Sequence, residues 1–167
     1  MSLSAIDKRE LRTTLGRFCT GVTVVSTADD EGVHAMTANA FTSVSMEPPL
    51  VLVSIDNRAR MHAKLPSTKR YGVSVLAADQ ERLAMHFAGR PDANHAVGFV
   101  WVDAIPLVRD AIAHFVCDSF ATHEAGDHTL YIGEVRSFDM RVGEPLLFHS
   151  GTFTRPANDP TITSWGW

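Results

Sequence analysis

The chain has 167 residues, of which 45% are hydrophobic and 20% are charged, and its formal net charge is -4 at pH 7. This length and composition fit one globular domain that buries a single sizeable core. The negative charge argues against a basic surface that follows nucleic acid phosphates or anionic lipid. Small-molecule chemistry is therefore favoured over polymer binding.

The two cysteines and the N-terminal residues bear on the cellular compartment of the protein. Cys19 and Cys117 show neither a disulfide framework nor the CxxC spacing of a zinc site, so we expect both to be reduced and buried. Residues 1–18 lack the continuous apolar run of a signal peptide, and no stretch has the length of a membrane span. The sequence predicts a cytoplasmic protein with no metal site, no membrane partner and no nucleic acid partner.

The first part of the chain combines one helix with several short strands. Ser4 as N-cap and hydrophobic residues at helical spacing predict an amphipathic helix that reaches Phe18. β-branched or alternating residues predict strands over 22–27, 33–36, 41–46 and 50–55. Turn residues join the first two strands into a hairpin, and Pro48 and Pro49, which cannot donate to a ladder, separate the last two.

The second part is predicted to be richer in strands. Helices are expected over 58–65 and 80–87, with a strand over 71–76 between them. Residues 88–103 show no period, which predicts a loop. Three more β-rich runs cover 111–120, 129–138 and 146–153. Six or seven short strands with few helices favour a closed or Greek-key barrel over a Rossmann sheet, and neither GxGxxG nor GxxxxGK[ST] is present.

Small polar side chains crowd the segment between two of these strands. Residues 36–49 contain Thr37, Asn39, Thr42, Ser43 and Ser45, which lose solvation unless they find partners. One interpretation is a polar strand edge with an Asx turn. The other is a flavin site, because an isoalloxazine ring carries N and O atoms along one edge that need fixed donors and acceptors.

Three further segments have both a functional and a structural interpretation. Arg58, Arg60 and Lys64 form either a phosphate receptor or a solvated basic helix. Residues 87–92 form a helix C-cap with its loop, or a lid over a bound ring. His128 follows Gly126 and Asp127 at the mouth of a strand, where it is either structural or hydrogen-bonds a flavin carbonyl or a nicotinamide amide. No metal motif or catalytic triad is evident.

In chain order, five segments resemble the flavin reductase-like family. They are residues 20–27, 37–51, 87–90, 126–128 with the following IGEV, and 144–148. The resemblance covers about 11–155 of a single domain over 1–167, and leaves 156–167 as a C-terminal tail. It implies a mainly β fold with inserted helices, namely a six-stranded Greek-key split β-barrel that binds FMN.

The resemblance also implies the residues of the site. Those along the isoalloxazine and ribityl chain would be Thr37, Ala38, Asn39, Ser43, Val44 and Ser45. Ala40 belongs to the same segment and stands where the family often has Ser, which removes one possible hydrogen bond to the flavin. Those toward the phosphate or the dimethylbenzene edge would be Asn57, Arg58, Ala59, Arg60, Phe87, Ala88 and Arg90. Gly151 and Phe153 would lie close by, with His128 at the nicotinamide as the catalytic residue.

The implied activity is that of an NAD(P)H-dependent flavin reductase. It would reduce FMN or FAD with a hydride from NADH or NADPH and supply a partner monooxygenase. A homodimer is expected, because one small barrel has too little depth to enclose a flavin. Hydride transfer needs no protein nucleophile, which agrees with the missing triad. Two alternatives stay open: a pyridoxamine phosphate oxidase-type FMN enzyme, against which the Gly-Asp-His segment argues, and a non-enzymatic flavin-binding or redox-sensing module.

Overall fold

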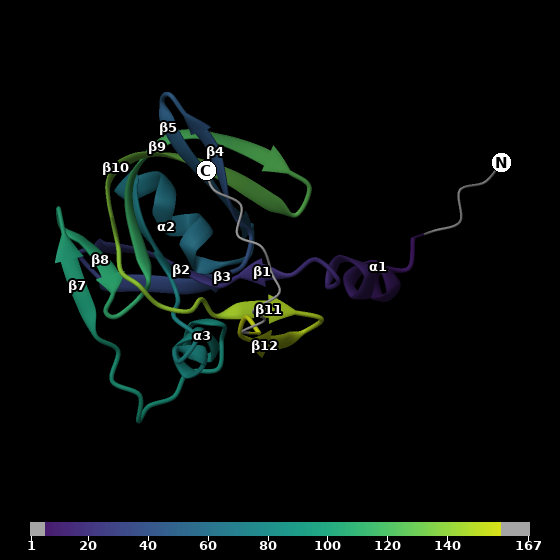
Figure 1. The fold of residues 1–167 in the computed structure, drawn as a ribbon. Helices are drawn as coiled ribbons and strands as arrows, with labels where there is room; N and C mark the ends of the chain where they lie inside the picture. The colour runs from purple at the N-terminus through teal and green to yellow at the C-terminus, as the bar shows by residue number, and fades with distance from the viewer. Residues whose placement is uncertain (1–5, 158–167) are drawn as a thin grey trace.

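Strands dominate the computed structural model, which describes residues 6–157 (Figure 1). Its helices are α1 (Lys8–Leu15), α2 (Arg60–Thr68) and α3 (Glu81–Phe87). Its strands are β1 (Thr20–Gly21), β2 (Thr23–Asp29), β3 (Gly32–Ala38), β4 (Phe41–Met46), β5 (Pro49–Asp56), β6 (Arg70–Val75), β7 (Phe99–Val102), β8 (Ile105–Val108), β9 (Ala113–Ala125), β10 (His128–Met140), β11 (Leu147–His149) and β12 (Thr152–Thr154). Among the described residues, no helix is long and apolar enough to cross a membrane.

The main sheet has seven antiparallel strands in the order β3-β2-β6-β9-β10-β5-β4. It curls so that its edge strands, β3 and β4, are joined by the two-residue link 39–40. The Ser54 amide of β5 donates to the Ala40 carbonyl at 3.0 Å, which extends the β4–β5 pairing into this link. The sheet is split and does not close into a continuous barrel. The predicted mainly β, split-barrel fold is confirmed, although this sheet contains seven strands where six are expected.

Helices and small sheets cover the curled sheet at different places. In Figure 1, α2 lies within the curl, α3 lies beside β11 and β12, and α1 extends away from the body. The β7–β8 hairpin is fixed by buried hydroxyls: Ser26 donates to the Pro106 carbonyl, and Ser74 Oγ accepts from the Val108 amide at 3.0 Å. These bonds satisfy polar groups that would otherwise be buried without partners.

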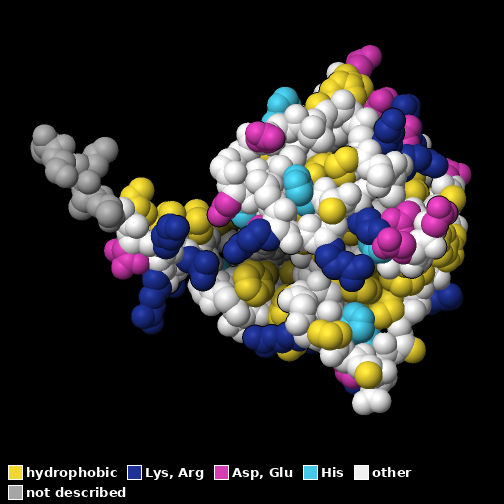
Figure 2. All heavy atoms as spheres, turned by 180° about the vertical axis from the view of Figure 1, so that it is seen from behind, with side chains coloured by type: hydrophobic (Ala, Val, Ile, Leu, Met, Phe, Trp, Pro, Cys, Tyr) yellow, Lys and Arg dark blue, Asp and Glu magenta, His cyan; other side chains and the backbone are white. Residues whose placement is uncertain are grey.

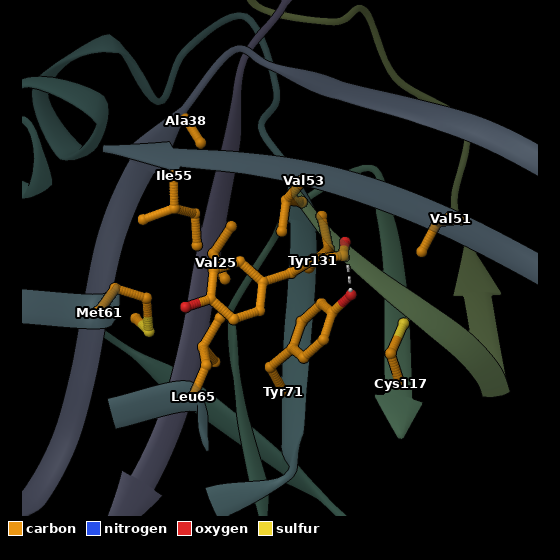
Figure 3. Close-up of a cluster of buried hydrophobic side chains, with 11 residues drawn as sticks. Val25, Ala38, Val51, Val53, Ile55, Met61, Leu65, Tyr71, Cys117 and Tyr131 are labelled. Carbon is orange, nitrogen blue, oxygen red and sulfur yellow. Dashed lines mark hydrogen bonds between the residues drawn. The ribbon is translucent and has the colours of Figure 1, made fainter. Parts of the chain in front are cut away.

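Tyrosine and aliphatic side chains from both halves of the chain form the core inside the curl (Figure 3). Tyr71 is fully buried and its hydroxyl donates to the Tyr131 carbonyl at 3.5 Å. Burial raises the pKa of Tyr71 and raises that of the Cys117 thiol to about 12, so both stay neutral. Each fully buried aliphatic side chain contributes about 1.5–3 kcal/mol to folding.

Several sequence-based expectations are wrong in detail. The helix starts at Lys8, where Asp7 Oδ1 accepts from the Arg9 amide at 2.8 Å and caps it, whereas Ser4 lies outside the described residues. That helix ends at Leu15 instead of reaching Phe18. Cys19 is exposed, whereas Cys117 is buried as expected.

Two predicted segments have a different secondary structure. The expected loop over 88–103 contains β7, which pairs with β8. The expected single run over 146–153 is a hairpin of β11 and β12. Ser150 and Gly151 have φ values of +49° and +81° at its turn, a left-handed conformation in which glycine is favoured. The tail from 158 onward lies outside the described residues.

We expect Gly133→Ala to destabilise the protein by about 1–3 kcal/mol. A methyl group at Gly133 would collide with the Tyr71 hydroxyl and lie 2.8 Å from Cys117 Cβ, both in the packed core. Urea unfolding measures the change. Gly21→Ala is the matched control, because a methyl group there meets no atom within 4 Å. Equal midpoints for the two variants would contradict the described packing.

Candidate functional site

The larger of two hollows near the meeting sheet edges has a volume of about 600 Å³ and is called the α1 hollow. Its lining consists of Arg12, Leu15, Gly16, Phe18, Thr20, Asn39, Ala40, Phe41, Thr42, Leu52 and Phe148. Figure 2 shows hydrophobic side chains on the floor of a hollow beside the N-terminal helix, with basic side chains around it. Thr20 Oγ1 is buried there without a hydrogen-bond partner among the described residues.

A second hollow of about 370 Å³, called the β3 hollow, lies between β3, α2 and α3. Its lining consists of Glu31, Val33, His34, Ala35, Met36, Ala59, Arg60, Met61 and Phe87. The β3 strand leads directly into the segment that lines the α1 hollow. One strand therefore connects the two hollows.

The predicted flavin residues of the 37–45 segment divide into three groups. Asn39 and Ala40 are exposed and line the α1 hollow. Thr37 and Ala38 take part in the packing of the fold. Thr37 Oγ1 donates to the Ala84 carbonyl at 2.7 Å, and Ala38 is buried. The remaining three residues line neither hollow: Ser43, Val44 and Ser45 form a β-bulge in β4 opposite β5.

The 56–60 loop and the Gly-Asp-His turn, which are far apart in sequence, lie side by side. The Asn57 amide donates to the Asp127 carbonyl at 3.0 Å, and Thr129 Oγ1 donates to Asn57 Oδ1 at 2.8 Å. His128 starts β10 opposite Asp56 of β5. The structure thus brings the predicted phosphate and nicotinamide residues together at one end of the sheet.

Charge around this turn is partly compensated within the protein. Arg58 Nη2 lies 2.7 Å from Asp56 Oδ2, and the Arg58 hydrogen bond holds the pKa of that carboxyl well below its usual range. His128 Nδ1 lies 2.8 Å from Asp127 Oδ1, and this contact lowers the pKa of Asp127. Both carboxylates are ionised at neutral pH, so Arg58 already has an anionic partner.

The remaining predicted residues divide between the surroundings of the hollows and exposed turns. Phe87 lines the β3 hollow and contacts Phe99, with ring centroids 6.2 Å apart. Phe153 packs on Phe148 at 5.3 Å and so supports a wall of the α1 hollow. Ala88 and Arg90 are exposed after α3, and Gly151 is exposed in the β11–β12 turn. None of these last three residues lines either hollow.

Sequence reasoning missed an ion network beside the β3 hollow. Lys64 Nζ lies 2.8 Å from Asp29 Oδ2 and 2.6 Å from Glu31 Oε2, and His34 Nε2 lies 2.8 Å from Asp29 Oδ1. The carboxylates and the imidazole are close enough to hold a metal ion, but the Lys64 ammonium already contacts both carboxylates. The sequence signal that could have indicated this network is the set of charged or polar residues at 29, 31 and 34 around the predicted hairpin turn.

A split antiparallel barrel with a roomy hollow at its seam is the architecture of a small barrel that holds one ligand. The model of the flavin reductase like domain matches residues 15–157. The chain belongs to the flavin reductase-like family.

Individual relatives cover most of the chain. It is 51% identical over 146 residues to an NADH-dependent flavin reductase of a Rhodococcus species, covering 86% of this chain and 83% of the relative. An NADH-dependent FAD reductase of Streptomyces globisporus is 42% identical, covering 92% and 88%. The solved structure of the flavin reductase PheA2 superposes with a TM-score of 0.89 at 44% identity, covering 92% of this chain and 100% of that one.

We expect Thr129→Val to destabilise the protein by about 1–2 kcal/mol, because it leaves Asn57 Oδ1 without its donor in a partly buried position. Urea unfolding gives the free energy. Hydrogen exchange should also be faster at the Asn57 amide, which bonds to Asp127. Thr122→Val, on an exposed position of the adjacent strand, is the control. An unchanged Asn57 exchange rate would mean that this hydroxyl does not join the loop to the turn.

Proposed function

We propose that this protein is an NADH-dependent flavin reductase that reduces FMN or FAD and supplies the reduced flavin to a partner monooxygenase. The observation that carries the proposal is a flavin-sized hollow lined by Asn39, in a chain of this family whose 57–59 loop is hydrogen-bonded to the Gly-Asp-His turn. Relatives named as NADH-dependent flavin reductases support the reaction and the donor. Reductase subunits of flavin-dependent monooxygenases among the relatives support the partner.

The α1 hollow fits a flavin in size and chemistry. Its volume of about 600 Å³ is within the ordinary range for cofactor sites. Phe18, Phe41 and Phe148 offer an apolar surface to a flat ring. The exposed Asn39 amide and the unpartnered Thr20 hydroxyl offer hydrogen bonds to its polar edge.

Both FMN and FAD fit this proposal, because each carries the same ring. The bound flavin supplies the electron-accepting centre, and the nicotinamide donor supplies the hydride. Asn39 fixes the ring by its polar edge, while the apolar walls exclude water. His128 hydrogen-bonds the nicotinamide amide and orients the donor, with its own ring held through Nδ1 by Asp127. Ala59 and Arg60 extend the site toward the flavin phosphate.

A homodimer is part of the proposal. None of the residues of α1 is buried. Leu15 at its end and Phe18 after it are 65% and 78% exposed, although they line the α1 hollow. Phe138, Met140 and Val142 are further apolar side chains that are strongly exposed. Apolar surface of this extent is typical of a protein interface. A second copy would cover α1 and complete the wall of the hollow, in a cytoplasmic enzyme.

The dimer is tested by sedimentation equilibrium of the purified protein. We expect twice the chain mass in the flavin-loaded sample, and dissociation when both Leu15 and Phe18 are replaced by Ser. Met46→Ser, which removes a side chain that is 89% exposed outside the hollow, is the control. A flavin-loaded monomer would contradict the proposed dimer.

The reaction is tested by following the absorbance of NADH or NADPH during oxidation with FMN or FAD as acceptor. We expect turnover with NADH, and two variants should separate the two halves of the site. His128→Ala should raise the KM for NADH about tenfold and leave the flavin Kd unchanged, because its contact belongs to the donor. Asn39→Leu should raise the flavin Kd about tenfold by removing a polar partner and adding bulk.

Cys19→Ser is the control for both variants, since Cys19 is exposed and lines neither hollow. Thermal unfolding checks that all variants fold. If His128→Ala instead lowers the melting temperature and flavin occupancy together, while the folded fraction keeps normal kinetics, His128 is structural. If the protein binds flavin but oxidises neither NADH nor NADPH, the result would contradict the proposed reductase activity and support a non-enzymatic flavin-binding module.

A further inference from the structure

The turn between β2 and β3 carries a carboxylate whose position is fixed. Glu31 Oε2 lies 2.6 Å from Lys64 Nζ, and the Glu31 amide donates to Asp29 Oδ1 at 2.9 Å. The Lys64 side chain is only 18% exposed, so α2 presents its ammonium group in a restricted position. Glu31 itself is 70% exposed and keeps carboxylate surface available to a ligand.

This turn has an excess of negative charge. The Lys64 hydrogen bond lowers the pKa of Glu31, and it also lowers that of Asp29, so both carboxyls are ionised at neutral pH. The single Lys64 ammonium contacts both carboxylates, and the His34 imidazole contacts Asp29 alone, so Glu31 has no second basic partner among the described residues. A carboxylate charge therefore remains at the edge of the β3 hollow.

The β3 hollow combines the groups that an adenylate group needs. Phe87 presents an aromatic ring that can stack on a purine, and Arg60 presents a guanidinium that can pair with a phosphate. Glu31 lines the same hollow and can accept hydrogen bonds from ribose hydroxyls. The volume of about 370 Å³ suits a group of that size.

The β3 hollow is also within reach of the reaction site. Ala59 and Arg60 lie at the start of α2, directly after the loop that bonds to the Gly-Asp-His turn. A dinucleotide whose reactive ring lies near that turn can extend along this loop into the β3 hollow. Both proposed cofactors that contain adenosine, FAD and NADH, have this shape.

We infer that Glu31 is a specificity-determining residue, which receives the ribose hydroxyls of an adenylate group in the β3 hollow and excludes a ribose that carries a 2′-phosphate. A carboxylate that accepts from a 2′-hydroxyl is repelled by a phosphate at the same place. The adenylate group comes from either FAD or NADH, and the inference rests on the proposed function. Lys64 acts as a positioning residue that holds the Glu31 carboxylate.

The experiment compares wild type with Glu31→Gln in two arms. In the donor arm, kcat/KM is measured for NADH and NADPH with FMN as acceptor, because FMN contains no adenosine. If NADH supplies the adenylate group, the NADPH to NADH ratio rises about five- to tenfold, the size of a partly screened charge contact. In the flavin arm, Kd is measured for FAD and FMN by fluorescence without any donor. If FAD supplies it, the preference for FAD over FMN falls by a similar factor.

Asp30→Asn is the matched control. It removes a carboxylate from the same turn, and Asp30 does not line the β3 hollow. A shift in either arm for Glu31→Gln, with none for Asp30→Asn, supports the inference and identifies the source of the adenylate group. Unchanged ratios in both arms, or equal shifts in the two variants, would overturn it.

The flavin arm needs no turnover, so it separates this inference from the proposed function. An inactive wild type would contradict the reductase, while FAD and FMN affinities would still report on Glu31. Thermal unfolding of both variants checks the fold. Because Glu31 is exposed in a turn, we expect both to fold normally.

Discussion

The two-residue link 39–40 joins the edge strands β3 and β4 of the curled sheet, and the hydrogen bond from the Ser54 amide to the Ala40 carbonyl, 3.0 Å long, holds this link against β5 as a continuation of the β4–β5 pairing. The segment around Ala40 must then leave the ladder of β3 before it enters β4. This break exposes Asn39 and Ala40, and it opens the α1 hollow between them and α1. The candidate flavin hollow therefore lies where the chain passes from one edge of the sheet to the other.

A second constraint places the turn that carries His128. Asn57 bonds to the turn through its amide and its side chain, with partners at Asp127 and Thr129. The register of β10 against β5 sets His128 opposite Asp56. Strand pairing thus aligns two loops that are about seventy positions apart in sequence, a difference that follows from the residue numbers 57 and 127. The candidate phosphate-side residue Asn57 and the candidate donor residue His128 therefore lie at the same end of the sheet.

Much of the fold could be predicted because the strand signals are local. The run over 41–46 alternates large and small residues before two prolines, and β4 has these same bounds. The β7 strand was missed because it pairs only with the short β8, and buried hydroxyls on β2 and β6 stabilise that hairpin from outside. Tertiary contacts, and not a local hydrophobic pattern, stabilise β7, so residues 88–103 show no period of their own. Cys19 was misjudged because a small apolar residue carries no pattern that reveals its exposure.

The site was predictable in part for the same reason. Motif order proposed Asn39 and Arg60, and the structure places them in the linings of the α1 hollow and the β3 hollow. The β-bulge at Ser43 and Ser45 and the ion pair of Arg58 depend instead on partners that the motif does not contain. Lys64 was assigned to a basic cluster from its neighbours in sequence. The structure instead pairs it with Asp29 and Glu31 across more than thirty positions.

The most direct test of the account is a crystal structure of the protein with FAD and NAD⁺ bound. The account predicts the isoalloxazine ring in the α1 hollow beside Asn39, with the nicotinamide within hydrogen-bond distance of His128. A flavin ring bound in the hollow between α2 and β9, which His62 and Phe120 line, would contradict it. A nicotinamide remote from His128 would contradict the assignment of the donor site.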